Sequence, residues 1–360
     1  MAPAQDIRSG ASSSPGWVER AGPRAWRRIS RQRSSSGMDE GDVARQLRNI
    51  DPELRTRLHL LPKIDLRELD RSRATLLSNV PSLTDVAQKW DVEVSVDAVP
   101  RAPDEGPAVP VLLFRALERN TPSAALVWLH GGGFVLGSAL QEADFCAEVA
   151  SRFGITVVCV DYRLAPETPF PGAFDDAYSA VEWIHRRSEQ FLIDTDRIAV
   201  GGQSAGAGLA AAVALAARDR GGPKLCAQIL EVPVLDDRLE SASMLEFTET
   251  PVWTTTLASM SWQMYLASTE RTAEVPSYAA PARAIDLTRL PRAYLSAMEL
   301  DPLRDECIDY ACALLRCGVS AELHVYPGTF HRSSGLPAAV STRVRTDVVE
   351  AVGRLTKRFE

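Results

Sequence analysis

A single serine stands at the centre of the glycine-rich stretch "RIAVGGQSAGAG", residues 197–208. Ser204 follows a short apolar run that predicts a buried strand, and the alanine-rich run after it predicts a helix. Such a corner forces sparsely populated backbone angles, and Gly202 and Gly206 avoid the collisions that side chains would cause beside it. This G-x-S-x-G pattern predicts a nucleophilic serine whose neighbour, Ala205, offers an N–H group at a helix N-terminus. The alternative is a glycine-rich turn that carries an incidental serine.

Three consecutive glycines follow another expected strand, in "LVWLHGGGFVLGS" at residues 126–138. The exposed amides of such a loop can stabilise the oxyanion that forms when a serine attacks a carbonyl group. The alternatives are a flexible loop and a phosphate-binding loop. A phosphate loop calls for a lysine or a helix directly after the glycines, and "FVLGS" offers neither. We therefore predict an oxyanion hole here.

The general base for the serine must come from five histidines: His59, His130, His185, His324 and His331. His331 lies in "YPGTFHRSSG", after the last expected strand, and the loops that follow parallel strands meet at the edge where ligands bind. The other four fall in the N-terminal helical region, the glycine loop, a helix surface and the last strand itself. His331 is the candidate base, and a solvated loop histidine is the alternative.

Two aspartates compete for the role of the acid that orients the histidine. Asp301 ends an expected strand just before Pro302 opens a helix, which places it at the same edge of the sheet. Asp305 lies one turn into that helix. We predict that Asp301 orients the histidine, while Asp305 and Glu306 stabilise the helix N-terminus.

The overall composition limits which classes of protein are possible. The 360 residues are 45% hydrophobic, enough for one large core with an added cap or for two domains. A net charge of −7 argues against nucleic-acid and anionic-membrane partners, and no apolar run is long enough for stable membrane insertion. The six cysteines are scattered without a C-x-x-C pair, which predicts reduced thiols in a cytoplasmic protein and no metal site.

Residues 1–37 differ from the rest of the chain because they are rich in Arg, Ser and Gly and poor in acids. A transit peptide, a disordered arm, or upstream sequence before a true start at Met38 would each have this composition. We favour a disordered arm.

Strands and helices alternate after a helical region at residues 38–90, which predicts an α/β protein with a mostly parallel sheet. The exception is an insertion at about 238–268, which is rich in Met, Trp and Leu and has no strand character. Strands are expected at 92–99, 108–116, 124–130, 155–162, 197–200, 225–235, 292–300 and 321–328. Helices are expected at 142–154, 173–191, 209–220, 302–316 and 339–357.

From about Asp51 to the C-terminus, the chain resembles the hormone-sensitive-lipase-like branch of α/β-hydrolase esterases, the bacterial carboxylesterase and arylacetamide-deacetylase group. The resemblance rests on five segments in the family's order and spacing. They are "HGGGFVLGS", "VDYRLAPETPFPGAFDDAY", "DRIAVGGQSAG", "DPLRDE" and "HVYPGTFH".

The resemblance implies an α/β-hydrolase fold: a mostly parallel eight-stranded sheet flanked by helices, with a helical cap. Residues 38–90 and about 238–268 would form the cap, the latter inserted in a catalytic domain at 91–360. The site residues that it implies are the triad Ser204, Asp301 and His331 and the oxyanion amides of Gly132, Gly133 and Ala205. As pocket walls we add Phe134, Trp253 and Met260.

The implied activity is that of a serine carboxylesterase that cleaves short- to medium-chain acyl esters through an acyl-enzyme, without a metal or organic cofactor. A deacetylase or lactone hydrolase of a secondary metabolite is a narrower alternative. A non-catalytic small-molecule receptor is a third, although the family's receptors lack the histidine that stands here at His331. The expected binding partner is a small-molecule ester substrate, and the sequence leaves open whether the protein forms a homodimer.

Three positions depart from the family pattern. Gln203 stands where Asp or Thr is usual, and Ala207 replaces a second glycine after the serine. The loop "HRSS", with Arg332 after the histidine, replaces the frequent "HGF". None of these changes removes a catalytic group, so we expect them to alter substrate preference.

Overall fold

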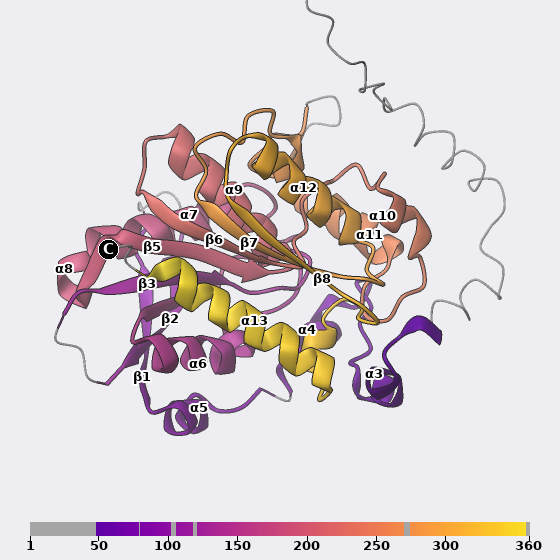
Figure 1. Cartoon of the computed structure of the whole chain (residues 1–360), viewed down its shortest axis with the longest axis horizontal. Helices are drawn as coiled ribbons and strands as arrows, with labels where there is room; N and C mark the ends of the chain where they lie inside the picture. Colours follow the sequence, from indigo (N-terminus) through magenta and orange to yellow (C-terminus); the bar gives the residue numbers. More distant parts are fainter. Residues whose placement is uncertain (1–47, 79, 102–105, 118–120, 270–273, 358–360) are drawn as a thin grey trace, which may run out of the picture. The chain divides into compact units, whose positions relative to one another are not determined.

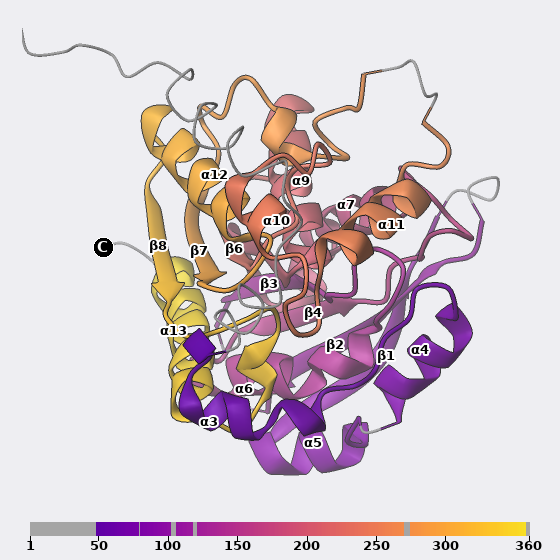
Figure 2. The same cartoon turned by 90° about the vertical axis from the view of Figure 1, so that its right-hand side faces the viewer.

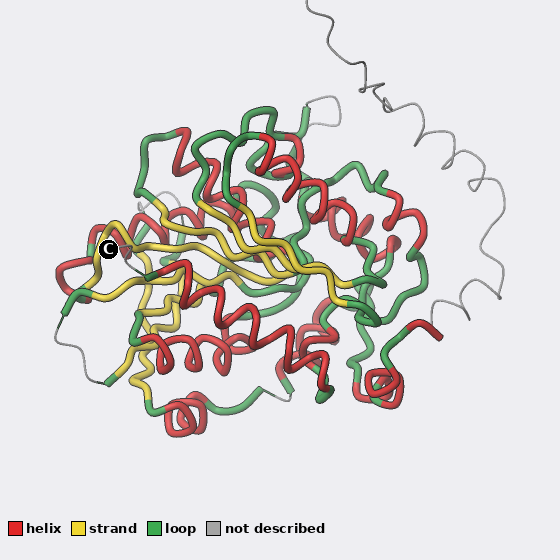
Figure 3. Tube along the Cα trace, in the orientation of Figure 1, coloured by secondary structure: helices red, strands yellow, loops and turns green. Residues whose placement is uncertain are grey.

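The computed structural model of the chain describes residues 48–357 except 79, 102–105, 118–120 and 270–273. The predictions for residues 1–37, and for the start of the helical region at 38–47, lie outside the described residues. The described chain forms one sheet with helices on both of its faces (Figures 1 and 3). None of its helices is both long enough and apolar enough to span a membrane.

The sheet has eight strands in the order β1-β2-β4-β3-β5-β6-β7-β8. β1 and β2 run antiparallel to their neighbours, and the strands from β4 to β8 pair in parallel. The strands are β1 (Val92–Val99), β2 (Val109–Ala116), β3 (Ser123–Leu129), β4 (Thr156–Val160), β5 (Ile193–Gln203), β6 (Leu225–Glu231), β7 (Arg292–Met298) and β8 (Ala321–Tyr326). The predicted α/β class and mostly parallel sheet are confirmed. β5 begins at Ile193, earlier than expected. The polar residues that follow Ile193 break the apolar pattern, although the strand continues through them across a bulge.

The central strands are buried on both faces, as their continuous apolar runs predict. Trp128 of β3 packs toward one helical layer, while its neighbours Val127 and Leu129 pack toward the other. The first layer holds α5 (Leu83–Trp90), α6 (Ala143–Phe153) and α13 (Ala339–Thr356). The second holds α7 (Gly172–Arg186), α9 (Ala205–Asp219) and α12 (Arg304–Arg316), and the short α8 (Ser188–Phe191) follows α7.

In its described part, the helical run expected at 38–90 is a series of short helices. They are α3 (Pro52–Thr56), the 3-10 turn η1 (Leu58–Leu60), α4 (Leu69–Leu77) and α5. The run is broken at Asp51, whose carboxylate caps α3 by accepting from the N–H groups of Glu53 and Leu54, and Pro52 begins the new helix. α5 packs against α6, where the Trp90 indole donates to Asp144 at 2.9 Å.

The insertion at 238–268 is helical, with α10 (Ala242–Glu246) and α11 (Thr255–Tyr265). Hydroxyl side chains cap both helices: Ser241 accepts from Met244 N–H and Thr254 from Leu257 N–H. α11 and α4 both pack against one apolar cluster, made of Leu66, Val135, Leu136 and Ala165. Both insertion helices and α4 lie on the side toward which the parallel strands point (Figures 1 and 2). Three further 3-10 turns are η2 (Ala139–Glu142), η3 (Pro281–Arg283) and η4 (Ser333–Gly335).

Candidate active site

Ser204 forms the corner between β5 and α9. Its backbone angles, φ 56° and ψ −117°, are strained for a residue with a side chain. A Cβ atom on Gly206 would lie 2.1 Å from the Leu129 carbonyl oxygen, and one on Gly202 would lie 2.5 Å from the same atom. Glycine is therefore required on both sides of the serine, as the sequence pattern predicts.

Ser204, His331 and Asp301 come together at the carboxyl edge of the sheet. Ser204 Oγ lies 3.0 Å from His331 Nε2, and His331 Nδ1 lies 2.7 Å from Asp301 Oδ2. When Nδ1 donates to the carboxylate, Nε2 accepts from the serine hydroxyl, which is the arrangement a nucleophilic serine needs. The carboxylate is itself held by the Leu303 N–H group, which donates to Asp301 Oδ1 at 3.0 Å. All three residues are at most 2% exposed, so the network is shielded from water.

The other acids near Asp301 point elsewhere. Asp305 accepts from the N–H group of Ser243 in α10 at 2.8 Å, and so connects α12 to the insertion. Glu306 accepts from the Leu235 N–H group at 2.7 Å, and burial raises the pKa of its carboxyl well above the usual value.

Of the five histidines, His331 is the one whose ring contacts Ser204 in the described chain. His130 stacks on Tyr162 with ring centroids 4.0 Å apart, and burial lowers its pKa. His324 pairs with Glu322 on β8 at 2.8 Å. His59 lies in η1 and His185 in the last turn of α7.

The glycine loop after β3 passes directly beside the nucleophile. A Cβ atom on Gly131 would lie 3.5 Å from Ser204 Cβ. Gly132 and Gly133 have φ values of 126° and 61°, which only glycine adopts without strain. Ala205 is the first residue of α9, where N–H groups have no intrahelical partner. This arrangement suits an oxyanion hole of the predicted composition.

Aromatic side chains from the insertion cover the site. The Trp253 ring centroid lies 5.7 Å from that of His331, and a Cβ atom on Gly133 would lie 2.5 Å from Trp253 Cη2. Phe134 stacks on Tyr265 of α11 with centroids 3.9 Å apart and planes 10° from parallel. Met260, our other choice for a pocket wall, packs instead in the apolar cluster that joins α11 to α4.

Glu231 contacts both catalytic loops, and the sequence reasoning missed it. Its backbone carbonyl accepts from the Ser204 N–H group at 2.8 Å, and its Oε1 accepts from Ser334 Oγ, three residues after His331, at 2.9 Å. Gln203 is its register partner on β5, so the two side chains lie next to each other on neighbouring strands. Burial raises the Glu231 pKa. The sequence feature that could have identified Glu231 is a carboxylate at the end of an apolar, buried strand.

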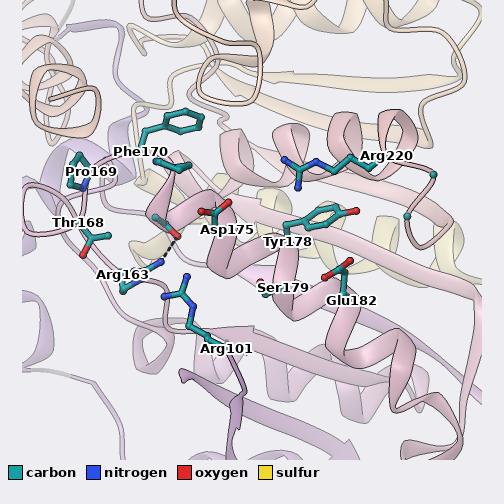
Figure 4. A pocket seen from close by; sticks show the side chains of 14 residues that line it. Arg101, Arg163, Thr168, Pro169, Phe170, Asp175, Tyr178, Ser179, Glu182 and Arg220 are labelled. Atoms are coloured by element: carbon teal, nitrogen blue, oxygen red, sulfur yellow. Dashed lines mark hydrogen bonds between the residues drawn. The ribbon is translucent and has the colours of Figure 1, made fainter. Parts of the chain in front are cut away.

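A separate surface pocket lies beside α7 (Figure 4). Arg163 forms a bidentate pair with the fully buried Asp176, with its Nη2 and Nε each 2.9 Å from a carboxylate oxygen. Phe170 on the pocket rim donates its N–H group to the Tyr265 carbonyl at 2.7 Å. The pocket wall thus anchors the end of α11. Ten of its lining residues are drawn with labels: Arg101, Arg163, Thr168, Pro169, Phe170, Asp175, Tyr178, Ser179, Glu182 and Arg220.

A nucleophilic corner on a mostly parallel sheet, followed along the chain by an acid and then a histidine, defines an α/β hydrolase. A family model of the α/β hydrolase fold matches residues 126–334. Carboxylesterase NlhH of Mycobacterium tuberculosis is 34% identical over 300 residues, which are 82% of this chain and 91% of that protein. The ethyl acetate hydrolase of Pseudomonas putida is 32% identical over 251 residues, 68% of this chain and 78% of that protein.

Among solved structures, a bacterial heroin esterase is 45% identical with a TM-score of 0.82, and the match covers 87% of this chain and 99% of that one. The chain belongs to the hormone-sensitive-lipase-like branch of the α/β-hydrolase family. It is an enzyme whose reaction class is carboxylic ester hydrolysis. The family assignment made from the sequence motifs is confirmed.

Proposed function

We propose that the protein is a serine carboxylesterase for short- to medium-chain acyl esters, with Ser204 as nucleophile, His331 as base and Asp301 as orienting acid. The observation that carries the proposal is the continuous pair of contacts from Ser204 Oγ through the imidazole to the carboxylate, at 3.0 and 2.7 Å. Burial of all three residues strengthens the electrostatic interactions between them.

The chemistry proceeds in two halves. His331 Nε2 takes the serine proton while Oγ attacks the ester carbonyl, and the oxyanion is stabilised by the amides of Gly132, Gly133 and Ala205. The imidazolium then gives its proton to the departing alcohol, which leaves the acyl group on Ser204. Water then attacks this ester while it gives a proton to His331 Nε2. When the second oxyanion collapses, the bond to Ser204 Oγ breaks, the acid leaves, and the imidazolium returns its proton to Oγ.

The insertion supports a small acyl group. Trp253 of the insertion brings a large aromatic ring against His331 and Gly133, close to the nucleophile, which favours a small acyl group. The similarity to an ethyl acetate hydrolase points in the same direction. A deacetylase or lactone hydrolase would use the same groups. The proposal also keeps residues 38–90 and about 238–268 as a helical cap over the site, except for α5, which packs against α6 beside the sheet. It places the enzyme in the cytoplasm, where its six free cysteines stay reduced.

A fluorophosphonate probe and a series of p-nitrophenyl esters from acetate to laurate test the proposal. The probe should label Ser204, and Ser204→Ala or His331→Ala should lower kcat by up to about 10⁶-fold, because triad members act as a unit. The chain-length optimum should lie at about two to eight carbons, as expected for a closed pocket. Labelling of a different serine, or alanine variants within about tenfold of the wild-type kcat, would exclude this mechanism.

A further inference from the structure

The insertion reaches the glycine loop through one buried hydroxyl group. Ser261 of α11 is 2% exposed, and its Oγ donates a hydrogen bond to the Gly133 carbonyl oxygen. The same Oγ lies 2.9 Å from where a Cβ atom on Gly133 would be. Ser261 therefore packs directly on this glycine, although 128 residues separate the two in sequence.

The three peptide carbonyls around Gly133 are held in three different ways. The Gly132 carbonyl accepts from the Leu136 N–H group at 2.9 Å, within the loop itself. The Phe134 carbonyl accepts from the Ala165 N–H group at 2.9 Å, in the loop that follows β4. The Gly133 carbonyl, between them, is held by the cap hydroxyl. The orientation of the middle carbonyl thus depends on the insertion.

That orientation matters because Gly133 is a glycine at φ 61°, with no side chain to limit its backbone rotation. An oxyanion hole works when its donors are fixed before the charge develops, so a loose glycine loop loses stabilisation of the transition state. A hydrogen bond to the Gly133 carbonyl restricts rotation about the bond between its Cα and carbonyl carbon. The Gly133 N–H group lies in the preceding peptide plane, which meets this one at the Gly133 Cα atom. Fixing the carbonyl therefore limits movement of the atom that both planes share, and this keeps the N–H group directed at the oxyanion.

We propose that Ser261 is a positioning residue: its hydroxyl holds the Gly133 carbonyl and so orders the oxyanion hole from the cap. The inference rests on the proposed function and names a residue outside the triad and its amide donors. Trp253 packs on the same side of Gly133, where a Cβ atom would lie 2.5 Å from its Cη2, and so helps to exclude water that would otherwise compete for the carbonyl. Cap packing and oxyanion stabilisation are thereby coupled.

The test compares two cap serines that each donate to a backbone carbonyl outside the cap. Ser261→Ala should lower kcat by about 10- to 100-fold, less than the effect of removing an oxyanion donor outright, and should change KM by less than about threefold. Ser268, which is exposed whereas Ser261 is buried, is the control because its hydroxyl donates to the Phe170 carbonyl, away from the glycine loop. Ser268→Ala should stay within about twofold of the wild-type kcat.

A second measurement separates ordering of the oxyanion hole from general loss of structure. A trifluoromethyl ketone forms a tetrahedral oxyanion with the serine, whereas the matching methyl ketone reports binding of the uncharged ketone. Ser261→Ala should weaken the binding of the trifluoromethyl ketone by the same factor by which it lowers kcat/KM, and should leave the binding of the methyl ketone unchanged. Ser261→Thr, which keeps the hydroxyl, should recover most of both losses.

Two results would overturn the inference: an unchanged kcat in Ser261→Ala, or equal weakening of the two ketones. Should Ser261→Ala not fold, Ser261→Cys replaces the hydroxyl with a weaker donor of similar size and gives the same ratio of ketone affinities to measure. The wild type and Ser204→Ala decide the proposed function separately. If Ser204→Ala loses activity while Ser261→Ala keeps it, the triad stands and the positioning role alone is wrong.

Discussion

At the residue scale, Asp301 and Asp305 stand one helical turn apart and have separate partners. Asp301→Asn should lower kcat by about 10⁴-fold, because the imidazole loses its correct tautomer and the charge that stabilises the imidazolium. Asp305→Asn should leave kcat within about threefold and lower stability by about 1 kcal/mol, since it weakens the bond to the Ser243 N–H group. Steady-state kinetics and urea unfolding of both variants measure the difference. The reverse pattern would assign the acid to Asp305.

Gln203 and Glu231 are neighbours on β5 and β6. Replacing Gln203 with the aspartate that is usual in the family tests whether the two side chains interact. Gln203→Asp would bring a second carboxylate beside the buried Glu231, where two like charges are costly. The variant should be less stable than the wild type, and Glu231→Gln should restore much of the loss. Urea unfolding of the four proteins should give an interaction energy of about 1–3 kcal/mol. Additive effects of the two changes would mean that the side chains are not coupled.

Some residues of the site can be identified from the sequence, and others cannot. The serine, the acid and the base each follow a strand, so one rule about the edge of a parallel sheet selects Ser204, Asp301 and His331. Ser261 and Glu231 act through partners 128 and 103 residues away in the chain. Glu231 is marked only as a carboxylate at the end of a buried strand, and nothing in the sequence marks Ser261, because their contacts depend on where the folded insertion and loops lie.

At the element scale, alternation of strands and helices was enough to predict the sheet, because each central strand is apolar on both faces. The N-terminal region was harder to predict. Its apolar spacing suits a longer helix, but Asp51 and Pro52 favour a new helix start, and local capping overrides periodicity there. The long helix expected at 173–191 likewise divides into α7 and α8 at Arg187.

The insertion should set acyl-chain preference through Trp253. Trp253→Ala removes the ring that packs on Gly133 and faces His331, so p-nitrophenyl esters with longer chains should become better substrates. Ser204 labelling should persist in the variant. Met260→Ala is the comparison: it should lower stability by about 1–3 kcal/mol and leave the chain-length optimum in place, because Met260 packs between α11 and α4. An unchanged optimum in Trp253→Ala would remove Trp253 from the pocket wall.

At the scale of the whole molecule, the glycine loop joins three distant parts of the chain. Arg73 of α4 donates its Nε–H group to the Val135 carbonyl at 2.9 Å, and Ser261 of α11 donates to the Gly133 carbonyl. The core supplies the N–H group of Ala165 for the carbonyl of Phe134, which lies between those two residues. The loop that carries the oxyanion donors is thus shaped by the N-terminal helices, the insertion and the sheet together.

Folding stability should depend on pH through Glu306, whose pKa is raised well above 4.5 by burial and by its neighbours Asp236 and Asp301. As the pH rises above 4.5, the unfolded chain releases this proton first, so stability falls until the pH passes the folded pKa. Glu306→Gln keeps an acceptor for the Leu235 N–H group but does not ionise. Its stability relative to the wild type should therefore increase in thermal unfolding as the pH rises from 4.5 toward the raised pKa of the folded state.

The pKa of Glu322 is shifted in the opposite direction to that of Glu306, so Glu322 serves as a control. Burial alone would raise its pKa, but hydrogen bonds from His324 and Arg354 lower it below 4.5. The stability that this carboxylate contributes is present above pH 4.5 and is lost as the pH falls through the folded pKa. Glu322→Gln should thus be less stable than the wild type at neutral pH, with a deficit that shrinks on acidification. Parallel pH profiles for the Glu306→Gln and Glu322→Gln variants would contradict the opposite environments of the two carboxyl groups.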